Sequence, residues 1–479
     1  MKLCMNWYHS RAIKHMLFYG LGLFMMKGLS LIMLPLLAHS LSQTDIGKLE
    51  LLTSVSAFAG IIVGLSMHEV LYRFVGQSQI DEKKTLANQI YLLSLLIAAC
   101  FVPVILTLCM FAERYTSMFQ ISELVTLSLG LSIEGAIGVS LAWLRMQDKA
   151  QAFVVISLST CALQASLILT FISLDFGVIG VLLSSVIAHT IQLIVLHRVN
   201  RFIWLSLPKM KVTLSYLKYS LPIALSGLLA FGLNGAEKWI LSSSSNLEQL
   251  AIYAIAAKFA LAMCILVQPF GMWWMPKRFH YLNENDIKFS QITHYGIVWI
   301  VLLSSTIVYA APIFIQLLLP ISYLSASQYL VGTLVVAMLK EITELTNIGL
   351  LFRKKTRILL YINLIATLIA LSMAWLLRDY LIWGILASLV VAQLIRLILV
   401  TYISQALYPI KYHYFSILLL LSLCSIHFLI SFHLNNIGLL VLFALIAPFS
   451  ILGISYTTNL LPTPSFGWLS SLTSSEKAS

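Results

Sequence analysis

Long apolar runs separated by short, basic loops dominate this sequence, and they restrict what it can fold into. Fourteen runs are long enough to cross a bilayer, which takes about 20 apolar residues in an α-helix. Only 10% of the residues are charged, whereas soluble proteins have about 25%. Because helices satisfy their own backbone hydrogen bonds in lipid, we predict an all-α polytopic membrane protein. The predicted spans are about 15–39, 50–75, 87–111, 122–144, 151–173, 177–197, 214–242, 250–275, 291–318, 327–351, 357–377, 381–407, 414–432 and 436–457.

The lysine and arginine residues predict the orientation of these spans. With the N-terminus in the cytoplasm, 22 of the 30 basic side chains fall on the cytoplasmic side, three on the opposite side and five inside spans. Basic loops favour the cytoplasmic side, so both termini are predicted there. The net charge of +12 does not indicate nucleic-acid binding, because the basic residues alternate with apolar spans instead of forming one patch.

The chain divides into two halves at its most basic linker. We predict an N-terminal lobe over 1–200, a cytoplasmic linker over 201–213 and a C-terminal lobe over 214–410. Spans one and seven share a rhythm: an aromatic and small-residue start, an apolar run, and a polar turn with an acid. This rhythm favours two pseudo-symmetric six-helix lobes. Two extra helices follow over 411–457, and the tail over 458–479 is predicted to be disordered.

Five basic residues lie inside predicted spans, where each charge costs a few kcal/mol and usually faces a cavity or a partner. One interpretation is a cationic lumen that binds an anionic group such as a diphosphate. The other is pairing within the membrane or extension of the side chain to the interface. The residues are Lys27, Lys238, Lys258, Lys340 and Arg396.

Acidic residues within the spans are candidates for coupling to H⁺ or Na⁺, and the sequence leaves the ion open. We select Glu134, Glu237, Glu341 and Glu344. Lys340, Glu344 and Asn347 are spaced i, i+4, i+7 and share one helical stripe. That stripe fits an ion-coupling site and a local Lys–Glu pair equally well.

Motifs for catalysis and for cofactors are absent from the sequence. There is no G-x-x-x-x-G-K-[ST] loop for ATP, and His68-Glu69 is followed by Tyr72 where a zinc protease has its second His. The six cysteines are scattered. We therefore predict neither an enzyme nor a bound cofactor or metal.

Several short motifs occur in an order that resembles a known family. They are Phe18-Tyr19-Gly20, Leu41-Ser42-Gln43-Thr44-Asp45-Ile46-Gly47, Tyr219-Ser220-Leu221-Pro222 and Glu237-Lys238-Trp239. Over residues 14–405 the chain resembles polysaccharide repeat-unit flippases, the O-antigen-type branch of the multidrug/oligosaccharidyl-lipid/polysaccharide exporter superfamily. It departs from that pattern at Glu237, where Asp is commoner, and at Lys238, where Arg is commoner.

This resemblance implies two helical lobes around a V-shaped cavity in the bacterial inner membrane. Such a protein turns an undecaprenyl-diphosphate-linked oligosaccharide from the cytoplasmic to the periplasmic leaflet by alternating access, for O-antigen or other surface polysaccharide. The implied partners are this polyprenyl-linked substrate, membrane lipid, and the polymerase and chain-length proteins of the pathway.

Three alternatives stay open beside this interpretation. Fourteen spans also fit a peptidoglycan lipid-precursor flippase, although only Lys27 is buried in span one. A multidrug or cation antiporter of the same superfamily is less compatible with a basic lumen. A glycan polymerase or ligase, a different class of protein, usually needs a larger outer loop than any here.

Overall fold

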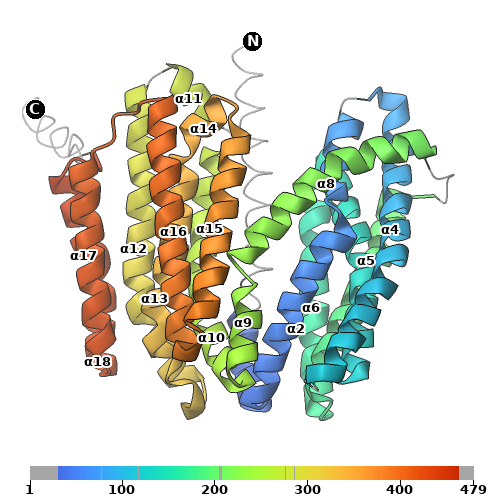
Figure 1. Cartoon of the computed structure of the whole chain (residues 1–479), viewed down its shortest axis with the longest axis horizontal. Helices are drawn as coiled ribbons and strands as arrows, with labels where there is room; N and C mark the ends of the chain where they lie inside the picture. The colour runs from blue at the N-terminus through green and yellow to red at the C-terminus, as the bar shows by residue number, and fades with distance from the viewer. Residues whose placement is uncertain are drawn as a thin grey trace, which may run out of the picture.

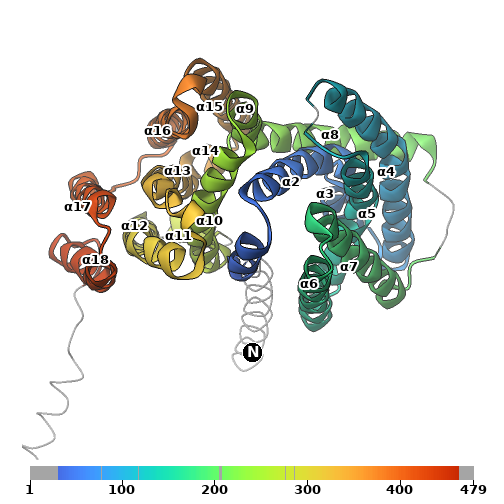
Figure 2. The same cartoon turned by 90° about the horizontal axis from the view of Figure 1, so that it is seen from below.

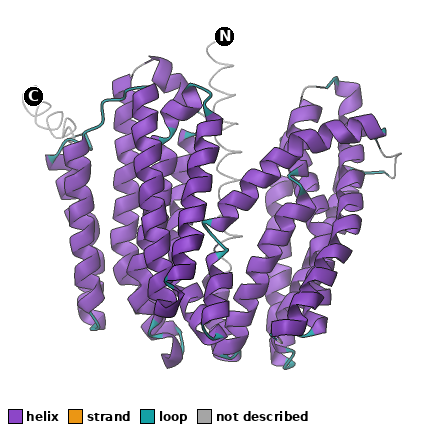
Figure 3. Ribbon diagram, viewed as in Figure 1, coloured by secondary structure: helices purple, strands orange, loops and turns teal. Residues whose placement is uncertain are grey.

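The computed structural model describes residues 28 and 31–462, apart from residues 77, 117, 204–207, 276 and 285. Throughout this part of the chain the regular secondary structure is helical (Figure 3). Twelve described helices are long and apolar enough to cross a membrane, which confirms the predicted fold class. The main helices are α2 (Gln43–Gly64), α4 (Ile80–Thr116), α5 (Ile121–Met146), α6 (Ala150–Ser173), α7 (Gly177–Asn200), α8 (Met210–Gly232), α10 (Leu247–Trp274), α12 (Asp286–Leu318), α13 (Ala326–Thr346), α15 (Thr356–Leu376), α16 (Leu381–Leu407), α17 (Tyr414–His433) and α18 (Ile437–Thr457).

Two further predicted spans also correspond to helices. The helix Leu31–Ser40 is the described end of the first predicted span. Helix α13 coincides with the predicted span 327–351, but Lys340, Glu341 and Glu344 make it more polar than its neighbours. Each of the fourteen predicted spans therefore contains a helix in the described part of the chain.

The helices gather in two groups (Figures 1 and 2). The N-terminal bundle comprises α2 to α7, including the short α3 (Met67–Val70) and the π-helix η1 (Leu71–Val75). The C-terminal bundle comprises α9 (Glu237–Ser244) to α16, including α11 (Arg278–Glu284) and α14 (Ile348–Phe352). Helices α17 and α18 lie at its outer edge and pack on α12.

Helix α8 contacts both bundles. Near its start, the rings of Tyr216 and Tyr219 lie 4.7 and 5.8 Å from the ring of Phe74 in η1. Near its end, the hydroxyl of Thr367 on α15 donates a hydrogen bond to the carbonyl of Leu229 at 3.0 Å. The helix crosses diagonally between the bundles in Figure 1 and contains Pro222. Because α8 contacts both bundles, the lobe boundary at 201–213 stays a prediction.

Helix α2 forms the closest contact between the bundles. Its residues Ile46 and Leu51 share a buried cluster with Leu250 and Ile255 of α10. A Cβ atom placed on Gly47 would lie 1.8 Å from the carbonyl oxygen of Leu247, so any other residue there would collide with backbone. Farther along α2, the hydroxyl of Ser54 donates a hydrogen bond to the Gly235 carbonyl at 2.9 Å.

The glycines Gly60 and Gly64 of α2 serve packing on the opposite side of the helix, against α5. A Cβ atom on Gly135 would lie 3.5 Å from the Cα atom of Gly64. A Cβ atom on Gly60 would lie 2.8 Å from a carboxylate oxygen of Glu134. Small residues on α2 therefore bring it close to both bundles at once.

The contact at Gly47 predicts that Gly47→Ala separates α2 from α10. Backbone atoms must move to admit the methyl group, so disulfide formation between cysteines placed at Thr44 and Glu248 should fall several-fold. These two side chains lie 3.5 Å apart across the interface. The measurement uses a variant without the native cysteines.

Gly138→Ala is the matched control, because a Cβ atom at Gly138 meets nothing within 4 Å. It should leave cross-linking unchanged. Equal cross-linking in the Gly47→Ala protein and its parent would contradict the close approach of α2 and α10.

Candidate functional site

A single carboxylate joins the two bundles through two lysines. Glu50 of α2 accepts from the Lys238 ammonium of α9 at 2.7 Å and from the Lys258 ammonium of α10 at 2.5 Å. The three side chains are only 13% to 25% exposed. Charges this far from water are stable only when paired, so this cluster fixes the position of α2 against α9 and α10.

The local structure of α9 places Lys238 at the contact. After α8 ends at Gly232, the backbone turns through residues 233–236 and a new helix begins at Glu237. The predicted span 214–242 is thus interrupted. Glu237 is buried, and its Oε1 atom accepts a hydrogen bond from the Tyr253 hydroxyl at 3.2 Å. This bond holds α9 to α10 and directs Lys238 toward Glu50.

A cavity of about 250 Å³ lies beside this cluster within the C-terminal bundle. Its polar lining includes Asn234, Glu237, Lys238, Thr333 and Lys340, and its apolar lining includes Leu386 and Leu389. The buried Oε2 atom of Glu237 has no hydrogen-bond partner in the described part of the chain. The cavity therefore brings together two of the predicted cations and one of the predicted acids.

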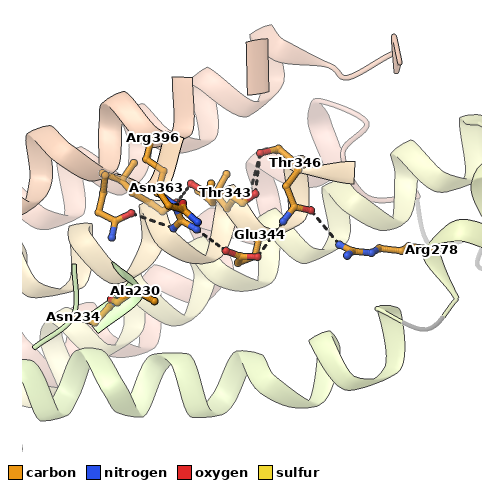
Figure 4. A network of polar contacts seen from close by, with 12 residues as sticks. Ala230, Asn234, Arg278, Thr343, Glu344, Thr346, Asn363 and Arg396 are labelled. Carbon is orange, nitrogen blue, oxygen red and sulfur yellow. Dashed lines mark hydrogen bonds and ion pairs between the residues drawn. The ribbon is translucent and has the colours of Figure 1, made fainter. Parts of the chain in front are cut away.

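A second polar network lies around Arg396 on α16 (Figure 4). Its guanidinium contacts a carboxylate oxygen of Glu344 at 2.8 Å and donates to the side-chain oxygen of Asn363 at 2.8 Å. Asn347 donates to the other oxygen of Glu344 at 3.0 Å and accepts from Arg278 at 3.2 Å. These bonds tie α13, α15 and α16 to α11.

Arg278 lies outside the spanning helices, at the start of α11. Burial lowers the pKa of its guanidinium from its ordinary value, and the nearby carboxylate of Glu344 opposes that shift. The guanidinium remains charged because its ordinary pKa is so high. Arg278 thus acts as a permanent cation at the end of the Arg396 network.

The structure separates the predicted site residues into groups. Four of them lie at or beside the cavity: Lys238, Lys258, Lys340 and Glu237. Two others, Arg396 and Glu344, belong to the second network. Glu134 lies against Gly60 in the N-terminal bundle. Glu341 is half-buried next to Lys340 on α13, and Lys27 lies outside the described residues.

Within the described residues, Glu344 pairs with Arg396 and not with Lys340. The interpretation of a local Lys340–Glu344 pair is therefore wrong. An arginine one helix away approaches Glu344 more closely because α13 and α16 pack side by side.

Sequence reasoning missed Glu50, the residue on which the contact between the bundles depends. The predicted second span begins at residue 50, so Glu50 was placed at a membrane edge. In the structure α2 begins seven residues earlier, at Gln43, and Glu50 lies two turns inside it. The available signal was the N-cap Ser42, whose side chain accepts a hydrogen bond from the Asp45 amide.

No set of three His, Cys, Asp or Glu side chains in the described part of the chain is grouped so that it could hold a metal ion. The charged groups of the site are instead cations and carboxylates in pairs. Two helical bundles that meet through such pairs, next to a polar cavity, resemble the arrangement of membrane transporters.

The comparisons with known proteins agree with that class. Residues 12–279 match the family described as polysaccharide biosynthesis protein, so the chain belongs to this family. No curated protein sequence matches it.

Solved structures share the fold at low sequence identity. The lipid II flippase MurJ, in an inward closed conformation, superposes with a TM-score of 0.74 at 13% identity, covering 92% of this chain and 99% of MurJ. The multidrug transporter DinF-BH gives 0.58 at 14% identity, covering 84% and 97%. An inward-facing multidrug resistance transporter of the MATE family gives 0.56 at 16% identity, covering 81% and 98%. This multi-pass membrane protein thus shares the fold of flippases and transporters.

The Arg396 network predicts a structural cost when it is broken. Arg396→Gln leaves the Glu344 carboxylate without its cation, which should cost about 2 kcal/mol and lower the midpoint of thermal unfolding in detergent. Combining it with Glu344→Gln should cost less than the sum of the two single changes, because both remove the same contact.

Arg378→Gln is the control. Arg378 lies at the surface and is 3.9 Å from the exposed Asp379, so its loss should leave the midpoint unchanged. A midpoint for Arg396→Gln equal to that of Arg378→Gln would contradict the structural role of Arg396.

Proposed function

We propose that this protein is a flippase that moves an undecaprenyl-diphosphate-linked oligosaccharide repeat unit across the bacterial inner membrane. The product would enter O-antigen or another surface polysaccharide. Membership of the polysaccharide biosynthesis family and the flippase-like fold support the proposal. The observation that carries it is the group of lysines at the junction of the bundles, where Lys238 and Lys258 meet Glu50.

The chemistry of the substrate explains why lysines are needed there. A diphosphate diester is anionic and cannot cross a hydrocarbon core without compensation. Ammonium groups form charge-assisted hydrogen bonds to phosphate oxygens. The flexible side chain of lysine lets the ammonium follow the position of the phosphate. Lys238 and Lys340 line a cavity, and Lys258 lies at the same carboxylate as Lys238, so three cations lie within one region.

Alternating access would use the contact between α2 and the pair α9–α10. While Glu50 holds the lysines, the bundles are joined at this face of the protein. Parting them would open a path to the side of the membrane on which this face lies. With both termini in the cytoplasm, the joined face would be periplasmic, and the substrate would enter from the cytoplasmic side.

Ion coupling is a further part of the proposal. Among the four acidic candidates, Glu237 is the best placed, because it lines the cavity, is buried, and precedes Lys238 directly. Binding of H⁺ or Na⁺ at its unpartnered oxygen would change the charge beside Lys238. Polymerase and chain-length proteins of the same pathway remain the proposed partners.

A peptidoglycan lipid-precursor flippase is the second candidate. The specific observation in its favour is the superposition on MurJ over nearly the whole length of both chains. Both candidates share a polyprenyl diphosphate, and the lysines would serve either. A cation antiporter fits less well, because three lysines near one cavity repel cationic drugs.

Proteoliposome transport tests this function. The protein should move a polyprenyl-diphosphate-linked oligosaccharide between leaflets, and Lys258→Gln should reduce the rate at least tenfold because one phosphate-compensating charge is lost. Lys355→Gln, which removes an exposed lysine outside the spanning helices, should keep the parental rate.

The substrates compared are the oligosaccharide lipid, the peptidoglycan lipid precursor and a cationic dye. Transport of the precursor alone would replace the first candidate by the second. Transport of the dye alone, or a parental rate in Lys258→Gln, would contradict the proposed role of the lysines.

A further inference from the structure

The Glu50 carboxylate occupies a position in which two ammonium groups converge. Its two oxygens are divided between them: Oε2 contacts Lys238 and Oε1 contacts Lys258. The carboxylate comes from the N-terminal bundle and both lysines from the C-terminal bundle. When the bundles part, the lysines therefore lose their counter-charge together.

Two lysines without that counter-charge would be unstable at this depth. Like charges a few ångströms apart in a medium of low dielectric constant repel strongly. An anion that replaces Glu50 would therefore favour the parted state. A phosphate group is a suitable replacement, because like a carboxylate it offers several oxygens to ammonium donors.

The structure provides room and a further donor next to the lysines. The cavity of about 250 Å³ borders Lys238 directly, and Lys340 faces it from α13. No ion pair of Lys340 is found in the part of the chain that the structure describes. Once Glu50 has withdrawn, Lys238, Lys258 and Lys340 leave an excess of positive charge beside the cavity, which complements the two negative charges of a diphosphate diester.

We propose that Lys238, Lys258 and Lys340 form a diphosphate-binding site that the side chain of Glu50 occupies whenever the bundles are joined. Glu50 is thus an internal substitute for the phosphate. This inference rests on the proposed function, which it extends by stating where the diphosphate binds and what keeps the site closed.

Occupation by Glu50 couples ligand binding to the movement of the bundles. Phosphate and Glu50 cannot hold the lysines at the same time. Phosphate therefore shifts the equilibrium toward the parted state by the ratio of its affinities for the parted and the joined states. Other contacts across the interface must break with it, and two of them lie at the start of α2. Gln43 donates to the Ser322 carbonyl at 2.7 Å, and Thr44 donates to Glu248 at 3.5 Å.

Binding of inorganic pyrophosphate to the purified full-length protein in nanodiscs tests this inference by calorimetry. Glu50→Gln removes the competing charge, so pyrophosphate should bind at least tenfold more tightly than to the parent. The gain should disappear when Lys238→Gln and Lys258→Gln are added to Glu50→Gln.

Glu248→Gln is the matched control, since no lysine of the described residues pairs with Glu248 and a glutamine keeps an oxygen that accepts from Thr44. Its affinity for pyrophosphate should equal that of the parent. Thermal unfolding of each variant establishes that it is folded before binding is compared.

An unchanged affinity in folded Glu50→Gln protein, or a gain that survives loss of both lysines, would overturn the inference. Failure of the proposed function gives a different pattern: pyrophosphate affinity rises in Glu50→Gln, but the reconstituted parent moves no lipid-linked oligosaccharide. Transport by the parent without the rise in affinity would overturn only the role of Glu50.

Discussion

The contact of one carboxylate with two lysines between the helical bundles is the interaction on which this structure depends. Glu50, Lys238 and Lys258 lie where water is scarce, so none of them is stable there alone. Apolar contacts around Ile46 and Leu250 support the junction, but they do not determine which charged side chains meet there. The ion pairs provide that specificity, and they can be exchanged for another anion. A junction of this kind can be strong and still reversible.

The rest of the fold places these groups. Gly47 permits the backbones of α2 and α10 to touch, which brings Glu50 within reach of both lysines. The break between α8 and α9 turns Lys238 inward, and the bond from Tyr253 to Glu237 holds that turn. Arg396 and its partners stiffen the C-terminal bundle away from the junction. One network thus maintains a bundle, and the other joins two bundles.

Much of the architecture could be predicted from the sequence, because a membrane-spanning helix requires about 20 consecutive, mostly apolar residues. Side-chain pairing could not, since it depends on helices that are distant in the sequence. Lys238 and Lys258 were recognised as costly charges, but their partner Glu50 is some 200 residues away. The spacing of Lys340 and Glu344 left a local pair and an ion-coupling site equally open, whereas in the structure α16 supplies Arg396 as the partner of Glu344. A charged residue inside a span can therefore be recognised from the sequence as one that needs a partner or a ligand. Only the tertiary structure shows whether its role is in binding or in stabilising the fold.

In the proposed mechanism, the junction at Glu50 opens and closes during transport. Double electron–electron resonance measures this movement as the distance between spin labels at positions 44 and 248, which face each other across the α2–α10 interface. We predict a short distance in the resting protein and a second, longer population when the polyprenyl-diphosphate-linked oligosaccharide is added to protein in nanodiscs. A single short distance under conditions in which the same protein transports its substrate would contradict it.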